Sequence, residues 1–182
     1  MACRRARAAL VAALLGTLAS VQPPPSLAGA AGSPAEVADR FIEENIGLTS
    51  RPLKLDELRR LVGPREERSR EVRNLHVPGQ VDRVIVLSGM GIEVEIYAPA
   101  SGAILVQRIT VTAADRKLPL GLRIGRTALG DIYKALGAGE DAKGPEGAFA
   151  RRFVSLEGTT SALLWFGRDE RLAGVEWRFG GD

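Results

Sequence analysis

The first clear pattern along the chain is an apolar stripe at helical spacing. A helix start is predicted at Ser33, because the sequence Ser-Pro-Ala-Glu supplies a serine cap, a proline at the first helical position and a glutamate that completes a capping box. The stripe that follows consists of Ala38, Phe41, Ile42 and Ile46. Gly47 is expected to end this helix, since glycine tolerates the left-handed conformation of a C-cap.

Two shorter helices are predicted further on. Residues 55–62 carry acids in the first turn and arginines in the last, and Gly63 and Pro64 follow them. A third helix is predicted over 127–136, with Thr127 as N-cap and Gly137 after its end. Its apolar face consists of Leu129, Ile132, Tyr133 and Leu136.

Between and after these helices the pattern changes to that of strands. Runs rich in β-branched and aromatic residues, separated by short turn-forming segments, are found at 81–87, 92–97, 103–112, 149–155, 160–166 and 172–179. The run Ile104-Leu105-Val106 is apolar at every position and is expected at the centre of the sheet. We expect the charged segment 65–73 to be a solvated connection and 138–147 to be a loop.

This order of elements predicts an α+β fold. N-terminal helices are followed by an antiparallel strand meander, one helix, and a second, three-strand antiparallel meander, with the helices on one face of the sheet. The part from residue 31 to 182 is expected to be one domain, with subdomains over 31–115 and 116–182.

Residues 1–30 have the features of a cleavable signal peptide. Three arginines precede an uncharged run from Ala8 to Ala19, and the small residues Ala28-Gly29-Ala30 form a cleavage pattern. The apolar run is shorter than the roughly 20 residues of a membrane span and is followed by three prolines. We therefore expect cleavage after Ala30, no membrane insertion afterwards, and a periplasmic or secreted protein.

Removal of this segment changes the charge of the protein. The chain has 25 basic and 22 acidic side chains, and residues 1–30 hold three arginines and no acid, so 22 of each remain. A neutral chain lacks the basic surface of a nucleic-acid binder. The one cysteine, Cys3, is removed as well, which excludes disulfides and thiolate metal sites. No cofactor or metal is expected.

The last third of the chain resembles the small outer-membrane assembly lipoproteins of the SmpA/OmlA (BamE) type. The resemblance rests on Gly125-Arg126-Thr127 at a helix start, Ile132 within the helix and Leu136-Gly137 at its end, followed by strands similar to Leu163–Phe166 and Leu172–Trp177. It implies a helix packed with a three-strand meander, a layout that β-lactamase-inhibitor-like domains share. It also implies binding rather than catalysis, although this chain has no lipid-anchor cysteine after its apolar run.

Two groups of residues are candidates for chemistry. His76, the only histidine, is six positions before Asp82, which suggests a general base oriented by a carboxylate, with Ser88 or Ser101 as nucleophile. No nucleophile-elbow pattern surrounds either serine, and a hydrogen-bonded histidine at a strand end is the structural alternative.

The second group is a pair of carboxylates. Glu93 and Glu95 alternate with apolar residues, so both point to the same face of one strand and could share a proton or hold a sugar or a cation. The structural alternative is a polar strand face exposed to solvent.

Together these patterns favour a soluble, non-catalytic binding or assembly module of a bacterial-type cell envelope. Its expected partner is an envelope protein or peptide, not a nucleic acid. The alternative is a small envelope hydrolase that uses His76 and Asp82, or Glu93 and Glu95.

Overall fold

The computed structural model describes residues 32–45, 47, 54–74, 76–100 and 102–180. The signal segment predicted over 1–30 lies outside these ranges. The helices are α1 (Pro34–Glu44), α2 (Leu55–Val62) and α3 (Leu129–Leu136), with short 3-10 turns at η2 (Pro119–Gly121) and η3 (Pro145–Gly147). The strands are β1 (Glu66–Arg73), β2 (Val81–Gly89), β3 (Ile92–Ala98), β4 (Leu105–Val111), β5 (Glu140–Lys143), β6 (Phe149–Val154), β7 (Thr160–Phe166) and β8 (Leu172–Phe179).

The strands form one antiparallel sheet in the order β1-β2-β3-β4-β8-β7-β6-β5. Each half of the chain is a meander, and the two meanders join where β4 pairs with β8 from Arg108 to Val111. The fold is therefore α+β, as expected, and most of it is sheet. The predicted arrangement is corrected in one respect, because the second meander has four strands rather than three.

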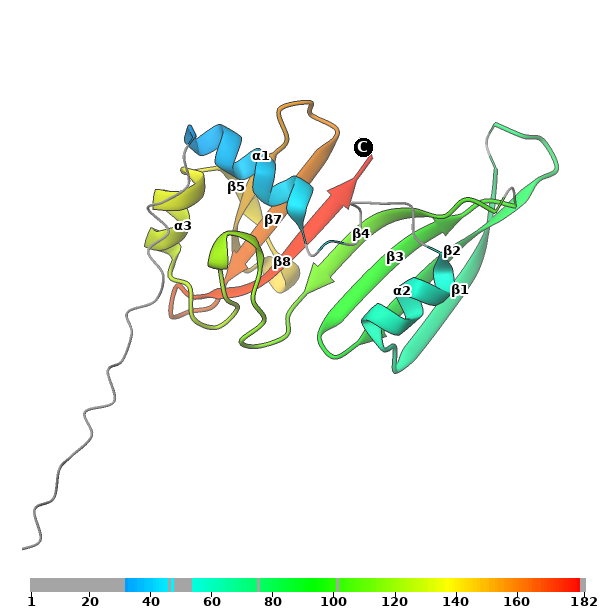
Figure 1. Cartoon of the computed structure of the whole chain (residues 1–182), viewed down its shortest axis with the longest axis horizontal. Helices are drawn as coiled ribbons and strands as arrows, with labels where there is room; N and C mark the ends of the chain where they lie inside the picture. Colours follow the sequence, from blue (N-terminus) through cyan, green and yellow to red (C-terminus); the bar gives the residue numbers. More distant parts are fainter. Residues whose placement is uncertain (1–31, 46, 48–53, 75, 101, 181–182) are drawn as a thin grey trace, which may run out of the picture.

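All three helices cover the same face of this sheet (Figure 1). α1 contacts β6, β7 and α3, while α2 contacts β2 and β3. A single hydrophobic core lies beneath them and includes residues from both halves of the chain, among them Phe41, Leu58, Ile96, Ile109, Ile132 and Trp177. The rings of Phe41 and Trp177 are in contact, with centroids 5.4 Å apart. Among the described residues, none of the helices has the length and apolar character needed to cross a bilayer.

The start of α1 follows from its sequence. Ser33 caps the helix, its hydroxyl accepting from the Glu36 N–H, and the Glu36 carboxylate accepts in turn from the Ser33 N–H at 2.6 Å. The end differs from the prediction, because the C-cap is Asn45 with φ 31° rather than Gly47. Ile46 of the predicted stripe lies outside the described residues.

Two segments predicted to be irregular are strands at the edges of the sheet. The segment expected as a solvated connection contains β1, and the segment expected as a loop contains β5. Both strands are charged and largely exposed, so neither has an apolar side that would give a strand signal in the sequence. Each is held through backbone pairing to one neighbour.

The expectation for Thr127 was wrong in part. α3 starts at Leu129 with Ala128 as N-cap, and the Thr127 hydroxyl accepts a hydrogen bond from the Arg123 N–H at 2.8 Å. Thr127 therefore stabilises the turn before the helix. β4 is central in the sheet as expected, but Leu105 is exposed because β8 pairs only with the other end of β4.

Candidate functional site

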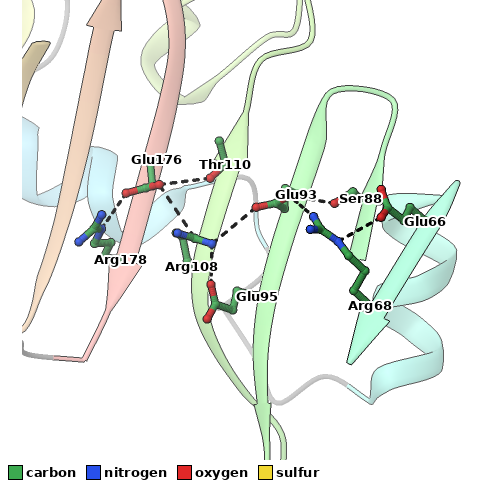
Figure 2. Close-up of polar contacts among 9 residues, drawn as sticks. All are labelled: Glu66, Arg68, Ser88, Glu93, Glu95, Arg108, Thr110, Glu176 and Arg178. Carbon is green, nitrogen blue, oxygen red and sulfur yellow. Dashed lines mark hydrogen bonds and ion pairs between the residues drawn. The ribbon is translucent and has the colours of Figure 1, made fainter. Parts of the chain in front are cut away.

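The sheet face opposite the helices, called here the open face, carries a connected group of charged side chains. Seven of its side chains form a continuous series of ion pairs across β1, β3, β4 and β8, called here the charge ladder (Figure 2). Its members are Glu66, Arg68, Glu93, Glu95, Arg108, Glu176 and Arg178.

Arg108 is the centre of the ladder. Its Nη2 lies 2.6 Å from Glu95 Oε2 and 3.6 Å from Glu93 Oε1, and its Nε lies 4.0 Å from Glu176 Oε2. The four side chains are between 14% and 34% exposed, so these charges are only partly screened by water. One guanidinium thus stands among three carboxylates.

The outer members of the ladder supply the remaining cations. Arg68 Nη2 lies 3.6 Å from Glu93 Oε2, and its Nε lies 3.1 Å from Glu66. Arg178 donates to Glu176 at 2.7 Å. Two hydroxyl groups also donate hydrogen bonds to these carboxylates. Ser88 donates to Glu93 at 2.9 Å and Thr110 to Glu176 at 3.5 Å (Figure 2).

The register of the strands explains how these side chains meet. Glu95 is opposite Arg108, Glu93 is opposite Thr110, and Thr110 is opposite Glu176 on β8. Because side chains alternate between faces, their neighbours Val94, Ile109 and Val175 all point into the core. The same alternation that builds the core therefore places the charges on one side of the sheet.

The open face offers charged groups of both signs for contact. Carboxylates and guanidiniums that hold one another in place form a fixed pattern of both signs, and such a pattern discriminates between partners through electrostatic complementarity.

His76 and Asp82 have separate environments. His76 is exposed in the turn between β1 and β2, where its backbone N–H donates to Asn74 Oδ1 at 2.8 Å. Asp82 is 1% exposed, and four donors bind its two oxygens, namely the side chains of Asn74, Gln80 and Tyr97 and the backbone N–H of Ala100. Those hydrogen bonds, that of Tyr97 first, lower the pKa of Asp82 to about 2.

The serines proposed as nucleophiles give no support to a triad. Ser88 donates its hydroxyl to Glu93 on the open face, and Ser101 lies outside the described residues. Asp82 thus ties two turns to the ends of β2 and β3, and its oxygens are occupied by groups other than the imidazole of His76.

Glu93 and Glu95 do share one face, as their alternation predicted. Both bind Arg108, which lies between them and β8. Sequence reasoning missed Arg108 and Glu176. Arg108 meets the two acids through the β3–β4 register, and Glu176 arrives through the pairing of β4 with β8, which joins residues 64 to 70 positions apart. A signal for Arg108 was available in the sequence, because Arg108 and Thr110 alternate with Ile109 and Val111.

A concave feature lies on the helix side. A pocket of about 320 Å³ separates α1 from the β6–β7 turn and is lined by Asp39, Ile42, Glu43, Ser155, Glu157, Thr159, Thr160 and Phe179. None of the four candidate residues lines it. In the part of the chain that the structure describes, no group of three or more His, Cys, Asp or Glu side chains is placed to hold a metal ion.

No protein-family model and no curated protein matches the chain. A solved structure, a DUF4309 family protein (YjgB) from Bacillus subtilis, is similar with a TM-score of 0.47 and 12% identity, over 80% of this chain and 95% of that one. The resemblance to the SmpA/OmlA (BamE) type stays a prediction.

Proposed function

We propose that the protein is an exported, non-catalytic binding module that holds a protein or peptide partner of the cell envelope on its open face. The observation that carries this proposal is the charge ladder, a fixed pattern of both signs on a sheet face that the helices leave uncovered. The resemblance of the last third of the chain to envelope assembly proteins supports it.

The signs of the ladder indicate the class of partner. Four carboxylates and three guanidiniums alternate across the strands, so the surface attracts neither a polyanion nor a polycation as a whole. A folded protein or peptide that presents the complementary pattern satisfies both signs at once. Nucleic acid, which needs a basic surface, is excluded on the same ground.

The hydrolase alternative has less support. Its first pair, His76 and Asp82, would need an imidazole bound to a carboxylate whose oxygens already accept from four other donors. Its second pair, Glu93 and Glu95, is bound to Arg108, and the serine beside it, Ser88, donates its hydroxyl to Glu93. Among the described residues no group of acids is placed there to hold a metal ion. A binding role requires none of these groups to be free.

The test is capture of partners from envelope extract by three forms of the processed protein. The wild type is compared with Arg68→Glu, which reverses a charge in the ladder, and with Arg60→Glu, which makes the same change on α2 on the other side of the sheet. We expect one protein to be recovered in stoichiometric amount by the wild type and by Arg60→Glu but not by Arg68→Glu. Equal recovery by all three forms, or none by any, contradicts the proposal.

Export is tested separately. The N-terminal residue of the protein recovered from cells that express the whole chain is expected to be Ala31, in a fraction outside the cytoplasm. Recovery from the cytoplasm with Met1 or Ala2 at the N-terminus would contradict export but not binding through the open face.

A further inference from the structure

The two edges of the sheet differ in a way that the proposed function does not explain. The β5 edge has four residues and is followed at once by the η3 turn, which shortens the edge. The β1 edge has eight residues, each paired with β2 on one side only. A long regular edge presents unpaired backbone groups that can accept another strand.

The register shows which groups of β1 point outward. The Asn74 N–H donates to Gln80 O at 3.0 Å, which continues the β1–β2 register. In an antiparallel ladder, opposite residues that exchange two hydrogen bonds (narrow pairs) alternate with opposite residues that exchange none (wide pairs). The inward groups therefore belong to residues 66, 68, 70 and 72. The outward N–H and C=O groups belong to Glu67, Ser69, Glu71 and Arg73, and no hydrogen bond to any of them is found among the described residues.

The side chains of β1 are charged but balanced. Three are acidic and three are basic, and they occur on both faces of the strand. An edge that carries one sign repels its own copy, whereas a balanced edge repels apolar strands and admits one with a complementary order of charges.

We propose that β1 pairs with β1 of a second copy of this chain, antiparallel about a two-fold axis at Arg70. In this register Glu67 is opposite Arg73 of the other copy, Ser69 is opposite Glu71, and all four outward residues lie in narrow pairs that exchange two hydrogen bonds each. The alternative centred on Ser69 sets Glu67 against Glu71 and Arg68 against Arg70. Charge complementarity selects the register centred on Arg70.

This register has one unfavourable pair, Arg70 with Arg70 on the axis. The dimer is consequently weak and forms as the protein concentration rises. Since the axis is perpendicular to the sheet, both open faces end up on the same side of one extended sheet.

Disulfide trapping tests the register directly. Cys3 is the one natural cysteine, so in a Cys3→Ser background an introduced cysteine is the only thiol. Arg70→Cys places two thiols in a wide pair across the axis, with Cβ atoms about 4.5–5.5 Å apart. Arg68→Cys faces Val72 instead. With oxidised glutathione as oxidant, we expect a covalent dimer from Arg70→Cys and none from Arg68→Cys, and any other result overturns the register.

Two further substitutions test the pairing without a cross-link, by sedimentation equilibrium. Ser69→Pro removes an outward N–H and no β1–β2 bond, so it is expected to abolish the dimer while the Tm is kept. Arg70→Thr removes the like-charge pair and is expected to tighten the dimer roughly two- to fivefold. A protein that stays monomeric in every form, or whose dimer is unaffected by Ser69→Pro, overturns the proposal even if partner capture by the open face succeeds.

Discussion

At the residue scale, Asp82 is the polar group on which the local structure most depends. Its carboxylate joins the turn before β2 to the turn after β3 through hydrogen bonds from Asn74, Gln80 and Ala100, with Tyr97 completing the set. An amide at this position would turn an NH₂ group towards donors and leave at least one of them without an acceptor. Asp82→Asn is therefore expected to lower the Tm clearly at neutral pH.

The lowering of the Tm by Asp82→Asn is expected to depend on pH. The pKa of Asp82 is lowered from 3.8 to about 2, mainly by the hydrogen bond from Tyr97, so the ionised carboxylate stabilises the folded state above the unfolded pKa. That contribution is lost as the pH falls from about 4 through about 2. The difference in Tm between wild type and Asp82→Asn, measured by circular dichroism, should shrink over that interval. A constant difference would contradict the assignment, and Glu140→Gln controls for the loss of one exposed carboxylate.

Gly174 is a second residue that a larger one cannot replace without a clash. A Cβ built on Gly174 would lie 2.1 Å from Cζ2 of Trp165, which covers β8 on the open face. Gly174→Ala is expected to reduce the free energy of unfolding by about 1–3 kcal/mol, the usual cost of overpacking. Urea denaturation provides the measurement.

Gly130→Ala is the matched control for this substitution. A Cβ at Gly130 meets no atom within 4 Å, and Gly130 lies within α3. Alanine there is expected to raise the free energy of unfolding by roughly 0.5–1 kcal/mol, because glycine is a poor helix former. Equal effects of the two substitutions would show that Trp165 does not occupy the space above Gly174.

At the scale of elements, α1 depends on its capping box. Ser33→Ala removes the hydroxyl that accepts from the Glu36 N–H and is expected to cost about 1 kcal/mol of stability. Ser33→Asp, which keeps an acceptor at the N-cap, should retain most of it. If Ser33→Asp loses as much stability as Ser33→Ala, the capping role of this side chain is contradicted.

The elements that the sequence predicted well are those with an apolar side. α2, β7 and β8 begin and end where expected. Apolar residues recur at helical spacing in α2, form a continuous run in β7 and alternate with other residues in β8. β1 and β5 were missed since they lie at the edges and bury almost nothing. An edge strand is specified by its neighbour's backbone, which its own sequence does not reveal.

At the scale of the whole molecule, one core and one sheet connect both halves of the chain. The core contains Leu58 of α2 as well as Leu164 of β7. Leu58→Ala is expected to reduce the free energy of unfolding by about 2–5 kcal/mol. Calorimetry should show one transition for the whole chain, at a lower Tm than in the wild type. Two separate transitions, with only one shifted by the substitution, would instead support independent subdomains over 31–115 and 116–182.

The candidate site shows the limit of sequence reasoning at this scale. The alternation in β3 placed Glu93 and Glu95 on one face, which is correct, yet the two alone suggested shared protons or a bound sugar. Their actual neighbour, Arg108, is fixed by the β3–β4 register with its irregularity after Glu95, and Glu176 arrives through the β4–β8 pairing. Both contacts depend on the pairing between strands, which the alternation within β3 does not reveal.

The placement of the two tryptophans has a practical consequence. Trp177 is fully buried in the core against Phe41, whereas Trp165 lies on the opposite face of the sheet, on the neighbouring strand. The chain contains no other tryptophan. Intrinsic fluorescence can therefore be divided by face: a Trp177→Phe protein emits from Trp165 beside the open face, and a Trp165→Phe protein emits from the core. A ligand on the open face should quench or shift the first signal and leave the second unchanged.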